Sequence, residues 1–245
     1  MEHITSLKNP KVAAWKALKD RKGRRESGCF LVEGRKMVEE ALASAFDVET
    51  VLVQEGMELP DGLTMPVYEL PAHVLAAVCD TKTPQGIAAV VRMKEQSALG
   101  KHIVVLDGVQ DPGNVGTILR TLDAFEADGL VLLPGCADPF SPKTVRSSMG
   151  AVFRRPVWTC TAETFAQVLR GSGLRLLGAA LRDDTVDARA ADYTRAVLAI
   201  GSEGRGLSDE VLALCDETVR IPMSPRCESL NAAVAASVLL WEAYR

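Results

Sequence analysis

Short apolar runs typical of β-strands alternate with helical patterns throughout residues 102–245. We expect strands at residues 102–107, 129–133, near Val157, and at 174–181, 196–200 and 218–221. We expect helices at residues 114–125, from Ser141-Pro142 onward, at 162–169 and 208–214, and from about residue 230. This alternation is typical of an α/β fold with a mainly parallel sheet covered by helices. Ligand-binding groups then belong at the carboxyl ends of the strands.

A smaller set of strands and helices precedes this block. Helices are expected at residues 10–20, 34–45 and 72–78, and strands at residues 29–32, 48–54 and 86–91. A basic turn at Gly23 and a Pro/Gly-rich loop at residues 56–66 lie between them. Residues 93–101 lose the apolar pattern and have linker character. We therefore predict a small α/β domain over residues 1–95 and a larger one over residues 101–245.

Charge is unevenly distributed along the chain, although the formal net charge is only −4. Residues 1–36 contain ten Lys and Arg against four acids, whereas residues 37–100 contain three basic residues against ten acids. A basic arm on an acidic body fits a protein that contacts a polyanion with one surface. A solvated helix face explains the same charges equally well.

The composition argues against several classes of protein. No apolar run approaches the roughly 20 residues of a membrane span, and the N-terminus lacks the apolar core of a signal peptide. We therefore expect a cytoplasmic protein with no membrane contact. The six cysteines form no C-x-x-C pair, and the three histidines are remote from them in sequence. We expect buried free thiols, with no metal and no disulfide framework.

Three polar segments follow expected strands in the second domain and indicate one shared site. They are Asp111-Pro-Gly-Asn114-Val-Gly-Thr-Ile-Leu-Arg120, Ile200-Gly-Ser-Glu203-Gly-Arg-Gly206 and Ile221-Pro-Met-Ser-Pro-Arg-Cys-Glu-Ser229-Leu-Asn231. They contain no Walker-type sequence, and no G-x-G-x-x-G follows the first strand of this domain, which argues against the common nucleotide-binding enzymes. They also lack the histidine or carboxylate clusters of triad and metal-dependent hydrolases.

Several polar residues of these segments have a simpler structural interpretation. Asn114, Ser229 and Asn231 stand near helix starts, where such residues commonly cap the helix. Arg120 has Asp123 three residues further along the same helix as a possible ion-pair partner.

Taken together, the three segments resemble the three signature motifs of the SpoU (TrmH-type) family of AdoMet-dependent RNA ribose 2′-O-methyltransferases. The motifs are N-x-G-x-x-x-R, G-S-E-G, and I-P-M followed by S-L-N, and their order and spacing agree with this sequence. The first block resembles the small N-terminal substrate-binding domain of the family. This second likeness lies in Leu7-Lys-Asn-Pro-Lys11, Phe30-Leu-Val-Glu-Gly34 and Thr83-Pro-Gln-Gly86.

The resemblance implies a C-terminal domain with a deep trefoil knot, whose loops bind S-adenosyl-L-methionine (AdoMet) in a bent form. The cofactor is then held largely by backbone groups of Gly201, Ile221, Leu230 and, less directly, Leu181. The resemblance also implies a homodimer. The final helix has few polar residues, so we expect it to be largely buried. With a dimer implied, its many alanines are interpreted as part of the subunit interface.

The same resemblance assigns catalytic roles to Asn114, Arg120, Glu203, Ser229 and Asn231. Arg120 acts either as the base or as an electrostatic stabiliser of the developing alkoxide, and we favour the second because guanidinium stays protonated at neutral pH. Asn114, Ser229 and Asn231 then orient the ribose or Arg120, and Glu203 braces that network.

RNA is the implied partner, with ribosomal RNA favoured over transfer RNA. The candidate RNA contacts in the first domain are Asn9, Arg24, Arg25, Arg35 and Lys36. The alternative function is a non-catalytic RNA-binding or ribosome-assembly protein on the same scaffold. Loss of Arg120, Asn114 or the Ser-Leu-Asn triplet would favour that alternative, yet all of them are present.

Overall fold

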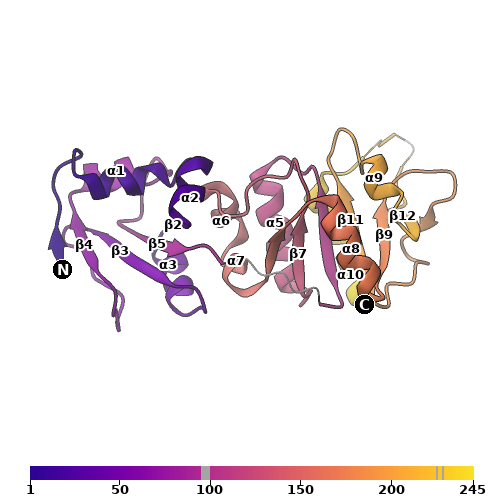
Figure 1. The fold of residues 1–245 in the computed structure, drawn as a ribbon, viewed down its shortest axis with the longest axis horizontal. Helices are drawn as coiled ribbons and strands as arrows, with labels where there is room; N and C mark the ends of the chain where they lie inside the picture. Colours follow the sequence, from indigo (N-terminus) through magenta and orange to yellow (C-terminus); the bar gives the residue numbers. More distant parts are fainter. Residues whose placement is uncertain (95–99, 225, 228) are drawn as a thin grey trace. The chain divides into compact units, whose positions relative to one another are not determined.

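The chain forms two compact units in a computed structural model that describes residues 1–94, 100–224, 226–227 and 229–245 (Figure 1). The first unit consists of Met1–Lys94 together with Phe140–Phe153, and the second holds the rest of the described chain. Residues 95–99, where most of the predicted linker falls, lie outside the described residues.

The first unit contains a mixed five-stranded sheet in the order β1-β4-β3-β5-β2. These strands are β1 (Glu2–His3), β4 (Val67–Leu70), β3 (Val48–Gln54), β5 (Ile87–Arg92) and β2 (Cys29–Glu33). The helices along this part of the chain are α1 (Pro10–Ala17), α2 (Arg21–Ser27), α3 (Arg35–Leu42) and α4 (Ala72–Val78). Val12 and Trp15 of α1 and Val74, Leu75 and Val78 of α4 belong to one core cluster with residues of the sheet.

The basic segment around Gly23, expected as a turn, is the helix α2. A Cβ atom on Gly23 would lie 2.1 Å from the carbonyl oxygen of Ala17, so only glycine permits this close approach of α2 to α1. The helix ends at Gly28, whose φ of +69° suits a residue without a side chain.

A segment between two strands of the second unit packs within the first unit. It carries α6 (Pro142–Ser148) and α7 (Ala151–Arg154), of which Arg154 is counted with the second unit. The rings of Phe140 and Phe153 lie 4.9 and 6.2 Å from that of Phe30 on β2, centroid to centroid. Arg146 on α6 pairs with Asp80 at 2.9 Å. The first unit is therefore built from two separate stretches of chain.

The second unit contains a seven-stranded, wholly parallel sheet in the order β10-β12-β9-β11-β6-β7-β8. These strands are β6 (Ile103–Asp107), β7 (Gly129–Leu132), β8 (Val157–Thr159), β9 (Arg175–Ala179), β10 (Val186–Asp187), β11 (Ala196–Gly201) and β12 (Glu217–Arg220). The helices are α5 (Pro112–Ala124), α8 (Ala162–Ser172), α9 (Asp209–Leu212) and α10 (Ala232–Tyr244). The predicted α/β architecture with a parallel sheet is confirmed. Among the described residues, no helix has the length and apolar character of a membrane span.

The final helix, α10, is buried on one side only. Ala233, Ala236 and Leu239 are almost fully buried, whereas Val234, Trp241 and Tyr244 are 48, 52 and 58% exposed. The face of α10 that carries Val234, Trp241 and Tyr244 is therefore not covered by the chain itself. A sequence that is apolar all round does not tell how many sides of a helix its own chain covers.

Candidate active site

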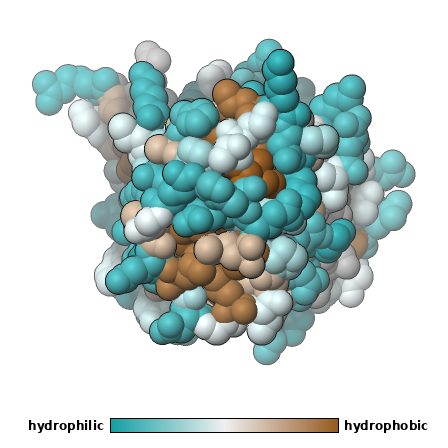
Figure 2. Space-filling model, turned by 90° about the vertical axis from the view of Figure 1, so that its left-hand side faces the viewer, coloured by the Kyte–Doolittle hydropathy of each residue, from teal (hydrophilic) through white to brown (hydrophobic). Residues whose placement is uncertain are grey.

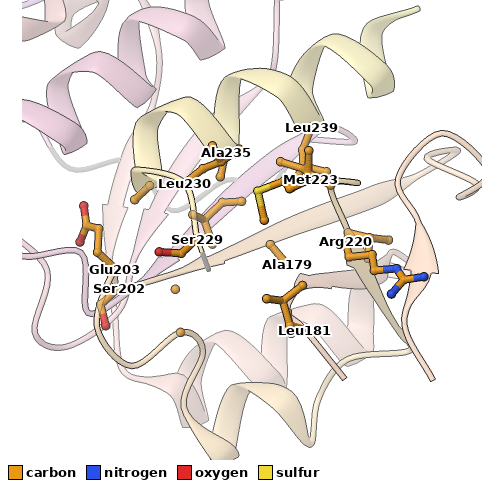
Figure 3. A pocket seen from close by; sticks show the side chains of 17 residues that line it. Ala179, Leu181, Ser202, Glu203, Arg220, Met223, Ser229, Leu230, Ala235 and Leu239 are labelled. Carbon is orange, nitrogen blue, oxygen red and sulfur yellow. The ribbon is translucent and has the colours of Figure 1, made fainter. Parts of the chain in front are cut away.

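One pocket of the second unit lies beyond the carboxyl ends of β9, β11 and β12 and has a volume of about 260 Å³ (Figure 3). Its walls are mostly apolar, and α10 contributes Ala235 and Leu239 to them. All four residues predicted to bind a cofactor line this one pocket: Leu181, Gly201, Ile221 and Leu230. Leu181, at the opening, is 64% exposed.

One wall of the pocket is the tight turn that follows β11. Ser202 and Gly206 exchange two backbone hydrogen bonds, of 3.1 and 2.9 Å. A Cβ atom on Gly201 would lie 2.0 Å from the carbonyl carbon of Gly206, and Gly206 itself has a φ of +68°. The glycines at both ends are therefore required by the backbone of the turn. This closure fixes the position of Glu203 between them.

Three residues, one from each predicted segment, join in a hydrogen-bonded chain. Asn231 donates from Nδ2 to Oδ1 of Asn114 at 3.1 Å, and Asn114 donates from its own Nδ2 to Oε1 of Glu203. Asn114 and Asn231 are 117 positions apart in sequence. The structure thus brings α5, the turn after β11 and the start of α10 together at the edge of the pocket.

The helix caps explain how the two asparagine amides are oriented. Asp111, not Asn114, caps α5, since its Oδ1 accepts from the backbone N–H groups of Gly113 and Asn114 at 2.6 and 3.1 Å. The capping interpretation of Asn114 is wrong because Pro112 begins the helix one residue after Asp111. Asn231 does cap α10, accepting at Oδ1 from Ala233 and Val234. Its amide therefore serves the helix and the network at once.

Arg120 lies outside this network in the single chain. It is exposed on α5, six residues beyond Asn114 and so about 120° around the helix from it. It does not line the pocket, and it makes no hydrogen bond or ion pair with the part of the chain that the structure describes. Arg120 and Asn114 therefore point in different directions from α5.

Asp123, the alternative partner of Arg120, is used elsewhere. It accepts from Nε of Arg154 and Nε of Arg155, both at 2.8 Å. Partial burial opposes its ionisation, but the hydrogen bonds from Arg155 and Arg154 outweigh this effect and lower the pKa of Asp123. The Arg120–Asp123 interpretation is therefore wrong.

The candidate RNA contacts of the first unit have different structural settings. Arg24 is 3% exposed, and its guanidinium donates to the carbonyls of Leu18 and Lys19 at 2.8 and 2.7 Å. Its prediction as an RNA contact is wrong, because these bonds tie α2 to the end of α1. Asn9 caps α1, accepting from the N–H of Lys11 at 2.9 Å.

The other three candidates, all of them basic, are more accessible. Arg35 donates to the carbonyl of Glu58 and lies 3.6 Å from the carboxylate of Glu39. Arg25 and Lys36 are exposed, with no partner in the described chain. Hydrophilic residues cover much of the face of the first unit seen in Figure 2, with apolar patches among them. Arg25 and Lys36 are thus available to a polyanion.

Several residues that line the pocket were not predicted. Met223 belongs to the Ile-Pro-Met segment, and Ala235 and Leu239 are one helical turn apart on α10. Their i, i+4 spacing places them on one helix face, but it does not distinguish a pocket wall from ordinary core.

Burial raises the pKa of the Cys79 thiol to about 12 and that of Cys136 to about 11. Among the described residues, no group of three metal-ligating side chains is present.

A parallel α/β unit with a pocket at its strand ends, preceded by a small α/β unit, is the arrangement of a ligand-binding α/β domain with an accessory domain. Residues 101–241 match the SpoU rRNA Methylase family, and residues 9–89 match the MRM3-like substrate binding domain. The chain belongs to the SpoU rRNA methylase family.

Characterised relatives cover nearly the whole chain. It is 38% identical to the 23S rRNA (guanosine(2553)-2′-O)-methyltransferase RlmP of Bacillus subtilis over 98% of both chains. It is 32% identical to the 23S rRNA (uridine(2479)-2′-O)-methyltransferase of Streptomyces viridochromogenes over 99% of this chain and 91% of the relative. An AdoMet-bound rRNA methyltransferase from Sinorhizobium meliloti superimposes with a TM-score of 0.90 at 33% identity, covering 99% of this chain and 97% of that one.

Proposed function

We propose that this protein transfers a methyl group from AdoMet to a ribose 2′-hydroxyl of ribosomal RNA. The convergence of Asn114, Glu203 and Asn231 beside one apolar pocket carries the proposal. Relatives named as 23S rRNA 2′-O-methyltransferases support the reaction and the class of RNA.

The lining of the pocket suits AdoMet chemically. Leu181, Leu230, Leu239 and Met223 offer apolar surface to the adenine, and the backbone at Gly201 and Ile221 offers polar groups. Glu203 lies at the edge of the pocket, apart from its apolar walls (Figure 3). When bound, AdoMet supplies an electrophilic methyl group. We infer that the loops carrying these residues form the trefoil knot that the family resemblance implies.

The polar side chains around the pocket have separate roles in holding the ribose and in stabilising charge. Asn114 and Asn231 each retain an amide N–H, which suits them to hold the ribose. The Ser229 hydroxyl lines the pocket and is placed to orient the same group. Arg120 stays protonated and stabilises the negative charge that develops on the ribose oxygen.

We propose a homodimer formed through the exposed face of α10. Trp241 and Tyr244 pack beside Phe125, with ring centroids 5.9 and 5.5 Å from it. With Val234 they leave an apolar surface on α10 that a second copy would cover. Because Arg120 does not line the pocket of its own chain, a dimer also provides a neighbouring site for it.

The first unit is proposed to bind the RNA through Arg25, Lys36 and the accessible part of Arg35, with Asn9 supporting α1. Exposed cations of this kind contact phosphates without reading sequence. We propose a cytoplasmic location, which action on ribosomal RNA supports.

Transfer of labelled methyl from AdoMet to purified 23S, 16S and transfer RNA, followed by digestion to nucleosides, tests the proposed function. We expect label in a 2′-O-methylated nucleoside from 23S rRNA. Label in a base would contradict the reaction. AdoMet binding without transfer to any RNA would favour a non-catalytic RNA-binding protein.

A further inference from the structure

We propose that Glu203 is the group that accepts the proton of the ribose 2′-hydroxyl. This inference rests on the proposed 2′-O-methyl transfer and assigns its proton, which that proposal leaves unassigned. The observations that carry it are the chemistry of the pocket lining and the hydrogen-bonded chain from α10 to Glu203.

Glu203 is the one carboxylate among the described residues that line the pocket or join its polar network. Ser202 and Ser229 are hydroxyls that hold their protons at neutral pH, and amides such as Asn114 accept protons even less readily. Arg120 and Arg220 are guanidiniums that have no acceptor. No histidine, lysine or cysteine lines the described pocket. Among the described residues of the pocket, Glu203 is therefore the one side chain with ordinary proton-accepting chemistry.

The hydrogen-bonded chain leaves one carboxylate oxygen of Glu203 available. The amide oxygen of Asn231 is taken by the N-terminus of α10, which directs its Nδ2 to Asn114. The amide oxygen of Asn114 is thereby occupied, and its Nδ2 faces Oε1 of Glu203. Oε2 of Glu203 has no partner in the described part of the chain. The orientation of both amides is thus fixed, and Oε2 of Glu203 remains available to accept the hydroxyl proton.

The position of Glu203 also fits the task. It projects from the turn that Ser202 and Gly206 close, at the pocket edge opposite Arg220 (Figure 3). Because Glu203 is exposed, its proton can pass on to water.

The proposed step balances in atoms and charge. The ribose O2′ forms a bond to the methyl carbon, the bond from sulfur to that carbon breaks, and its electron pair stays on sulfur. The hydroxyl proton moves to Oε2 of Glu203 and is later released to water. Arg120 remains a cation throughout.

Glu203→Gln is the sharpest test, because glutamine keeps an oxygen for Asn114 but cannot accept the proton at neutral pH. Under single-turnover conditions we expect methyl transfer to slow by about 100-fold or more. The dissociation constants of AdoMet and of the RNA, measured separately by titration, should stay within about threefold of those of the wild-type chain. Glu163→Gln, at an exposed position on α8, is the matched control.

The pH dependence separates Glu203 from Arg120 as the acceptor. With Glu203 as the acceptor, the wild-type rate should depend only weakly on pH between pH 6 and 9. The rate of Glu203→Gln should instead rise with pH, because hydroxide then accepts the proton of the ribose hydroxyl. A wild-type rate that climbs about tenfold per pH unit would overturn the proposal in favour of a guanidine base.

The remaining outcomes are equally distinct. Near wild-type transfer by Glu203→Gln would overturn the assignment, and so would a slow variant whose AdoMet or RNA affinity falls in proportion. Glu203→Asp, which keeps the carboxylate, should recover part of the lost rate. A wild-type chain that binds AdoMet but methylates no ribose would instead contradict the proposed function itself.

Discussion

The polar residues of the two units are organised in different ways. In the second unit, Asn114, Glu203 and Asn231 come from distant segments and meet in one hydrogen-bonded chain. In the first unit, the basic residues near the N-terminus have separate settings, from the buried Arg24 to the exposed Arg25. Motif residues with fixed spacing therefore indicate a site, whereas a count of positive charge does not. The N–H groups of an arginine guanidinium donate hydrogen bonds to backbone carbonyls as readily as to phosphates.

Removal of Arg120 should give the largest effect if the second unit works as proposed. Arg120→Ala should lower methyl transfer by about 100- to 1,000-fold, because a preorganised cation at the developing oxyanion is lost. AdoMet affinity should not change, since Arg120 does not line the pocket. Single-turnover transfer and AdoMet titration measure both quantities, with Arg170→Ala on α8 as control. Full activity of Arg120→Ala would contradict the conclusion that motif residues indicate a site whereas a count of positive charge does not.

Arg24 and Arg25 offer the most direct contrast within the first unit. Arg24→Ala should lower the free energy of unfolding by about 2 to 3 kcal/mol, because the carbonyls of Leu18 and Lys19 lose a charged donor. Arg25→Ala should leave stability almost unchanged but reduce the salt dependence of RNA binding by about one phosphate contact. Denaturant unfolding and salt-dependent RNA binding measure the two effects. Equal stability of the two variants would contradict this division.

The chain of asparagines predicts non-additive effects. Asn114→Ala should slow transfer by about 10- to 100-fold through misorientation of the reacting groups. Asn231→Ser keeps a capping hydroxyl for α10 but is too short to reach Asn114, so it isolates the network role. The double variant should lose little more than either single variant. Strictly multiplicative losses in this double-mutant cycle would show that the two residues act independently.

Asp123 should give a smaller, pH-dependent effect on stability. Asp123→Asn should lower the free energy of unfolding by about 1 to 2 kcal/mol at pH 7, because Arg154 and Arg155 lose their common partner. The folded-state pKa of Asp123 is lowered, so its contribution is complete above the unfolded pKa of about 4 and disappears as pH falls through the folded value.

Unfolding of this variant beside the wild-type chain from pH 7 down to pH 3 tests the sign. Asp183→Asn, in an exposed loop, serves as control and should match the wild-type chain. A stability difference that grows as the pH falls would contradict the ion-pair explanation.

Much of the second unit could be predicted because its strands are short, apolar and buried, and alternate with helices in a regular order. The assignment of Phe140–Phe153 to the first unit could not, because the partner of Phe140 and Phe153 is Phe30, more than 100 residues earlier. The helix α2 was missed because Gly23 and its charged neighbours are typical of a turn. Only packing against Ala17 explains a glycine there.

The candidate site shows the same limit. Sequence indicated which three segments belong together, and the pocket contains all four residues predicted for the cofactor. It did not indicate that Asp111 caps α5 or that Asn231 holds Asn114. Those contacts depend on which atoms of an amide are already occupied, and residue spacing carries no such information. The roles of these residues in catalysis remain predictions that the variants above test.

The most direct test is a map of 2′-O-methylated nucleotides in ribosomal RNA from cells that lack this protein. The map is then repeated after the wild-type chain or Arg120→Ala is returned to those cells. We predict that one 23S rRNA ribose loses its methyl group in the deletion strain and regains it with the wild-type chain but not with Arg120→Ala. An unchanged map in the deletion strain, or full restoration by Arg120→Ala, would contradict the account.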